Sequence, residues 1–100
     1  MFIKIGNVDF TRSTQAQYTV QSYSETSIGI RGHVQSEADL KLTEEQLYLL
    51  REGRTEEVEI QTDDGKVWKG LYRINELSWR KERKSDNSYE LVFNIGLQKK

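Results

Sequence analysis

Hydrophobic and polar residues alternate most regularly in the last third of the chain. From Tyr89 to Leu97 the odd-numbered residues are all large and apolar, whereas most even-numbered ones are polar or small. A period of two residues that is sustained over this length predicts a β-strand with one buried face. The segment from Val67 to Ile74 alternates in the same way. We therefore expect two strands here, with Trp68 and Phe93 in the core.

Shorter alternating segments earlier in the chain predict further strands. The clearest is Ser27 to Val34, in which the even-numbered residues are apolar or glycine. Polar residues around the other apolar segments mark turns and loops. We expect strands at Phe2 to Ile5, from Val8, and from Tyr18, with the polar stretch Thr11 to Gln17 as a loop.

One helix is predicted between these groups of strands. Thr43 suits the N-cap, and Gln46 three residues later completes a capping box. These signals predict a helix from Glu44 to Glu52. Its apolar face would pack against the sheet through Leu47 and Leu50.

The register of one hairpin follows from its pattern. Facing residues of an antiparallel pair lie on the same side of a sheet, so the loop between two apolar faces must hold an odd number of residues. The loop Asp63-Asp64-Gly65 satisfies this condition, with its glycine at a positive φ. It pairs Ile60 with Trp68 and Val58 with Gly70.

These elements predict a fold of the α+β class that is mainly β. We expect a two-sheet antiparallel β-sandwich or barrel with one flanking helix, formed by residues 1–100 as a single domain. The chain has no cysteine and no apolar stretch long enough to span a membrane. Its first residues are too polar for a signal peptide, so we expect synthesis in the cytoplasm.

Charge is distributed unevenly along the chain. Between Glu44 and Asp64 there are eight acidic and two basic residues, and between Lys66 and Lys84 seven basic and two acidic ones. Nucleic-acid-binding domains usually have a net basic surface. Acidic and basic stretches side by side favour complementary contacts within or between subunits instead.

No motif in the sequence indicates catalysis or metal binding. His33 is the only histidine and falls on the polar side of a predicted strand. Asp63 and Asp64 are typical of a turn and lack the spaced oxygen ligands of a calcium site. The glycines are scattered singly, so there is no phosphate-binding loop. We expect no enzyme activity, no cofactor and no metal.

One basic stretch needs a separate interpretation. Arg80 to Ser88 holds no apolar side chain and is predicted to be a loop between two strands. Its basic residues lie between Trp79 and Tyr89, and aromatic and basic side chains together can bind nucleic acid. The alternatives are a solvated loop, a contact with a partner protein, or a small nucleic-acid-binding β-barrel that uses residues 80–84.

The order of the helix, the hairpin and the last strand resembles the small tail proteins of long-tailed bacteriophages. The resemblance is to the minor tail protein U family and to the N-terminal domain of distal tail proteins. It covers about seventy residues and rests on the Leu-rich helix, the hairpin and the final strand with its basic end. The matching positions are Asp64, Gly65, Lys69, Gly70, Tyr72, Ile74, Leu77, Ser78, Phe93, Ile95 and Leu97.

This resemblance implies a tail-tube-like β-sandwich that assembles into a ring. The chain would then be a structural component of a phage tail or a related injection machine, as a terminator, distal tail, tube or baseplate protein. A hexameric ring is implied, with DNA passing through its bore without sequence-specific binding. Its other partners would be neighbouring tail proteins, and its location would be the virion.

A ring also suggests how the two charged stretches meet. In a head-to-tail assembly the same two patches meet at every interface. We expect the basic stretch of one subunit to approach the acidic region of the next. The residues of this predicted interface are Arg80, Lys81, Arg83 and Lys84 on one side and Glu52, Glu56 and Glu57 on the other.

Overall fold

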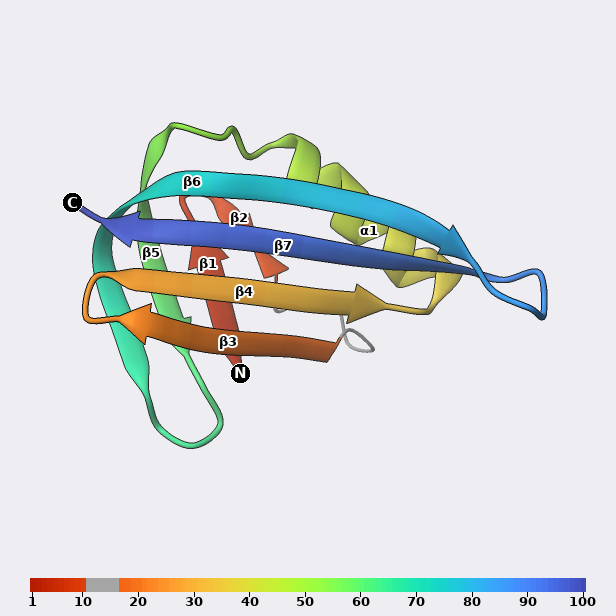
Figure 1. Cartoon of the computed structure of the whole chain (residues 1–100), viewed down its shortest axis with the longest axis horizontal. Helices are drawn as coiled ribbons and strands as arrows, with labels where there is room; N and C mark the ends of the chain where they lie inside the picture. The colour runs from red at the N-terminus through yellow and green to blue at the C-terminus, as the bar shows by residue number, and fades with distance from the viewer. Residues whose placement is uncertain (11–16) are drawn as a thin grey trace.

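The chain folds mainly into β-strands, with one helix (Figure 1). The structure is a computed structural model that describes residues 1–10 and 17–100. Of the predicted loop Thr11 to Gln17, only the last residue is described, as the first residue of a strand. The elements are β1 (Phe2–Ile5), β2 (Val8–Asp9), β3 (Gln17–Ser24), β4 (Ser27–Val34), α1 (Glu37–Tyr48), β5 (Thr55–Gln61), β6 (Val67–Arg83) and β7 (Tyr89–Lys99). The α+β, mainly β class is confirmed.

All seven strands belong to one antiparallel sheet, in the order β2-β1-β5-β6-β7-β4-β3. The sequence predicted two sheets, whereas the structure has one. This single sheet still forms two layers, for the following reason. The 17-residue strand β6 pairs with β5 through its first half and with β7 through its second, with a register shift between Ile74 and Glu76. Figure 1 shows β1 and β5 running across the direction of β4 and β7. The two layers are therefore two halves of one sheet, joined through β6.

The core lies between these halves and takes side chains from both. Ile3, Ile5, Val58 and Ile60 come from β1 and β5, and the apolar residues of β4 and β7 face them in the same buried cluster. The rings of Phe10 and Phe93 stack with centroids 5.9 Å apart. Phe93 is buried as predicted, whereas Trp68 is only half-buried and packs against the margin of the core. Tyr89, predicted on the inner face, is exposed.

The helix begins earlier than predicted. It runs from Glu37 to Tyr48 with Ser36 as its N-cap residue, so the capping role assigned to Thr43 is wrong. Thr43 lies inside the helix and is fully buried. The reason is that Leu40, one turn before Thr43, is also buried and extends the apolar face of the helix toward its N-terminus. Leu47 and Leu50 are buried as predicted, although Leu50 follows the helix.

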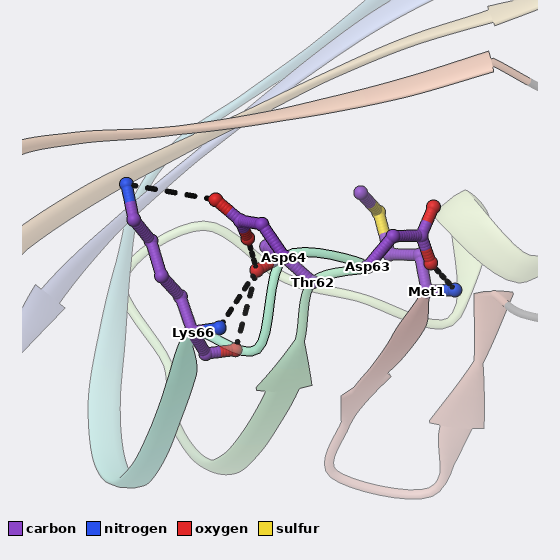
Figure 2. A network of polar contacts seen from close by, with 5 residues as sticks. All are labelled: Met1, Thr62, Asp63, Asp64 and Lys66. Atoms are coloured by element: carbon purple, nitrogen blue, oxygen red, sulfur yellow. Dashed lines mark hydrogen bonds and ion pairs between the residues drawn. The ribbon is translucent and has the colours of Figure 1, made fainter.

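The predicted register of the β5–β6 hairpin is confirmed. Ile60 faces Trp68 and Val58 faces Gly70. Gly65 has a φ of 88°, as the turn requires. Figure 2 shows how polar groups close this turn: the Thr62 hydroxyl accepts a hydrogen bond from the Lys66 backbone N–H at 3.0 Å.

The turn also contacts the start of the chain. In Figure 2 the N-terminal ammonium group of Met1 lies against the Asp63 carboxylate, at 2.5 Å. On the other side of the turn, the hydroxyl of Thr62 donates to the carboxylate of Asp64. Both aspartates therefore serve the turn and its surroundings, as their position in the sequence indicated.

The predicted nine-residue loop at Arg80 is wrong in extent. Strand β6 continues to Arg83 and pairs with β7, with Arg80 facing Val92 and Arg83 facing Tyr89. Only residues 84–88 form the turn between the two strands, and we call this turn the tip. The strand continues because its backbone hydrogen bonds are made to β7 and do not require buried side chains. Figure 1 shows the tip projecting past the start of α1.

Candidate functional site

The strand conformation divides the predicted basic patch between two faces. Successive side chains of a strand point to opposite sides, so Lys81 and Arg83 share a face with Trp79, whereas Arg80 lies on the opposite face. Lys84 lies in the tip. The four basic residues named by the sequence therefore do not form one surface.

The face with Trp79 packs against α1. The Trp79 and Tyr48 rings meet edge to face with centroids 5.2 Å apart. Lys81 Nζ lies 3.0 Å from Glu44 Oε1. Both contacts join the end of β6 to the helix of the same chain. Lys81 therefore already has an acidic partner, Glu44, in its own chain.

Arg80 and Arg83 also have partners in their own chain. Arg80 Nε lies 2.7 Å from Glu82 Oε1, and Arg83 donates from Nη2 to Asn87 Oδ1 at 2.7 Å. Both contacts are exposed, and an exposed ion pair such as Arg80–Glu82 contributes between zero and about 1 kcal/mol. These weak contacts leave the side chains available to a neighbouring molecule.

The three predicted acidic residues lie at the other end of α1 and on β5. Glu52 follows the helix, and its Oε1 accepts a hydrogen bond from the Leu77 backbone N–H at 3.2 Å. Glu56 pairs with Arg54 at 2.9 Å, and Glu57 is a residue of β5. Their contact with the basic residues of another subunit stays a prediction.

His33 has a specific partner that sequence reasoning missed. Its Nδ1 lies 2.5 Å from Glu90 Oε1. This hydrogen bond holds the pKa of the Glu90 carboxyl below its usual value. The pair joins β4 to β7 across the polar face of the sheet, and in the described part of the chain no cluster of three His, Cys, Asp or Glu side chains is suited to a metal ion.

Two hollows accompany the second half of β6. One, of about 470 Å³, lies on the polar face between residues such as Arg31, His33 and Arg80. The other, of about 750 Å³, lies between the start of α1 and the tip, next to Leu40 and Tyr89. Acidic and basic side chains are mixed in both, because Glu82 accompanies Arg80 and Glu44 accompanies Lys81. Neither hollow has the strongly basic lining that a polyanion would need.

The sheet has two further surfaces with unused backbone groups, which sequence reasoning did not single out. β3 pairs with β4 on one side, and within the described residues no strand pairs with the outer edge of residues 19–22. β5 pairs with β6 only as far as Arg73, and Glu52 bonds the edge at Leu77, so residues 78–83 have β7 on one side and no described strand on the other. The signal for the first edge was present in the sequence, since β3 has no charged residue and no proline.

Comparison with known proteins gives no relative. No protein-family model, curated protein or solved structure matches the chain. In the described residues, no helix has the length and apolar character needed to cross a membrane.

Proposed function

We propose that the chain is a structural subunit that assembles with copies of itself into a ring, as a component of a bacteriophage tail or a related injection machine. The resemblance of its helix, hairpin and last strand to small tail proteins supports this role. The observation that carries the proposal is the pair of unlike, unpaired edges on one half of the sheet.

This half consists of four antiparallel strands in the order β6-β7-β4-β3. Figure 1 shows β6 along its upper margin and β3 along its lower margin. Because four strands alternate in direction, the first and the last run opposite ways. The β6 edge of one copy and the β3 edge of the next would therefore pair antiparallel, and every copy would still have one edge of each kind at its two sides.

The β3 edge is suited to this pairing. Soluble proteins usually protect edge strands with charged residues, prolines, bulges or short length. The only irregularity of β3 lies between Ser22 and Ser24, next to its turn. Backbone hydrogen bonds to an added strand supply affinity without requiring any pocket, so such an edge needs no apolar patch.

A head-to-tail contact closes into a ring when the rotation that relates one copy to the next is a whole fraction of a full turn. By resemblance we propose six subunits, a bore that passes DNA without sequence-specific binding, other tail proteins as neighbours, and the virion as location. The structural role requires no catalytic group and no cofactor.

Two proline variants test the edge contact. Residues 19 and 22 are three positions apart, so their backbone N–H groups point to opposite sides of β3, and both side chains are exposed. One of the two variants Thr19→Pro and Ser22→Pro therefore removes an N–H that bonds β4, and the other removes an N–H that points outward. The variant that loses the outward N–H should stay folded and fail to assemble. The other should lose a bond to β4 and unfold at a lower temperature.

Light scattering of the wild-type chain and both variants gives their masses, and circular dichroism gives their thermal stability. If the proline variant that keeps wild-type thermal stability assembles as the wild-type chain does, the edge contact is removed from the proposal. A wild-type chain that stays monomeric and binds DNA with a steep salt dependence would instead favour the alternative, a nucleic-acid-binding module.

A further inference from the structure

A cleft of about 280 Å³ lies between α1 and the β1–β2 turn, away from the surfaces described above. One wall is a stripe of residues three and four positions apart on α1 and its C-cap residue Leu49: Leu42, Glu45, Gln46 and Leu49. The other wall consists of Asn7, Val8 and Asp9. Leu42 and Leu49 are among the exposed large apolar side chains, with 36% and 71% of their surfaces accessible. The cleft therefore has an apolar rim with an acidic residue between its two leucines.

Gln46, one of the residues that line this cleft, has a buried acceptor without a described partner. Gln46 is only 8% exposed, and its Nε2 donates a hydrogen bond to the backbone carbonyl of Asp9. Its Oε1 has no hydrogen-bond partner among the described residues. A buried acceptor without a partner costs free energy.

The tip of the β6–β7 hairpin has side chains that are complementary to those of the cleft. Tyr89 is 54% exposed beside the tip and faces Arg83 across the two strands. Lys84 is the residue after Arg83 and the first residue of the tip. It has no ion pair among the described residues. An exposed aromatic ring next to two basic side chains matches an apolar rim that contains a carboxylate.

The tip cannot reach the cleft of its own chain. It lies beside the first turns of α1, where it shares a hollow with Glu37, Leu40 and Lys41. The cleft is lined by the second half of the same helix. Figure 1 shows the tip projecting away from the body of the molecule. Any contact between the two surfaces must therefore join different copies.

We propose that the tip of one copy docks into the α1–β2 cleft of another, with Tyr89 against Leu42 and Leu49 and with Lys84 near Glu45. This second contact between copies rests on the proposed self-assembly and acts in addition to the pairing of sheet edges. It keeps the basic residues at the end of β6 in an interface and replaces the predicted acidic partners with Glu45.

Cysteine cross-linking tests this contact directly, because the chain has no cysteine of its own. One chain carries Ser85→Cys in the tip, and a second chain with an affinity tag carries Leu49→Cys. Both positions are exposed, so the substitutions should leave the fold intact. The expected product on mild oxidation is a mixed dimer that contains one tagged and one untagged chain. A matched control replaces Ser85→Cys by Lys66→Cys at the other hairpin turn, and it should give no mixed dimer.

The charges supply a second test in the same system. Adding Lys84→Glu to the tip chain should lower the yield of mixed dimer about tenfold, and adding Glu45→Lys to the tagged chain should restore it. If the wild-type chain assembles by light scattering but the Ser85 and Leu49 variants give no more product than the control, tip docking is wrong, whereas the edge contact is decided by the proline variants. A wild-type chain that stays monomeric at every concentration would overturn both.

Discussion

At the scale of single residues, the ring of Phe93 packs closely against a glycine. Gly32 on β4 lies directly opposite Phe93 on β7. A Cβ atom at Gly32 would lie 2.1 Å from the phenylalanine ring. The ring is also fixed from other directions by Phe10 and Tyr18, so it has little room to move. The absence of a side chain at this position therefore makes space for the ring of Phe93.

We expect Gly32→Ala to destabilise the fold by about 1–3 kcal/mol, the usual cost of overpacking. Urea unfolding of the variant and of wild type measures this difference. Gly65→Ala is a useful comparison, because a Cβ there meets nothing within 4 Å and any loss reflects only its positive φ. Unchanged stability of Gly32→Ala would show that Phe93 is not packed as described.

A second residue-scale prediction concerns the turn of Figure 2. The hydrogen bond from the Thr62 hydroxyl holds the pKa of Asp64 below its ordinary value of 3.8, with a smaller contribution from Lys66. A lowered carboxyl pKa stabilises the folded state at neutral pH, and this contribution is lost as the pH falls through the folded-state pKa. Thr62→Val removes the donor and should raise the pKa of Asp64. Carboxyl-carbon NMR titration of both proteins measures it, and identical titration curves would contradict the assignment.

At the scale of elements, Thr43 is the most deeply buried polar residue of the helix. Thr43 is fully buried, and its Oγ1 has no hydrogen-bond partner among the described residues. Burying a hydroxyl without a partner costs about 1–3 kcal/mol in proteins. Valine has nearly the same shape and a similar helix propensity.

Thr43→Val should therefore raise the free energy of unfolding by about 1 kcal/mol. Thr43→Ser, which keeps the hydroxyl and loses a methyl group, should lower it. Denaturant midpoints of the three proteins check the order. A valine variant less stable than wild type would mean that the hydroxyl has a partner, for example an ordered water.

The elements differ in how far the sequence could predict them. The β5–β6 register was predictable because a short loop and two apolar faces determine it locally. The start of the helix was not, because both Ser36 and Thr43 head a polar or acidic stretch and only tertiary burial of Leu40 decides between them. The end of β6 was missed because its strand conformation depends on β7, while its own side chains are those of a loop.

The same limit applies to the candidate surfaces. The sequence identified the basic residues 80–84 but could not show that alternate ones face opposite sides. The contact of Lys81 with Glu44 depends on where the helix lies relative to the sheet, and no local pattern encodes that placement. Edge strands are likewise a property of the strand order, which emerges only when the whole sheet is known.

At the scale of the whole molecule, the main feature is that the sheet is continuous. β6 belongs to both halves, so the two layers around the core and the unpaired edge of residues 78–83 both follow from one long strand. The half built from β6, β7, β4 and β3 exposes a polar face, and the other half and α1 lie behind it (Figure 1). A subunit of this kind has two unlike edges through which copies can join head to tail.

Native mass spectrometry of the unmodified chain at two concentrations tests this central claim most directly. Unlike edges that close into a ring predict one discrete multiple of the subunit mass, six by resemblance, whose stoichiometry does not change between the two concentrations. A ladder of all sizes would indicate an open filament. A monomer, or a dimer that never grows, would contradict the head-to-tail ring.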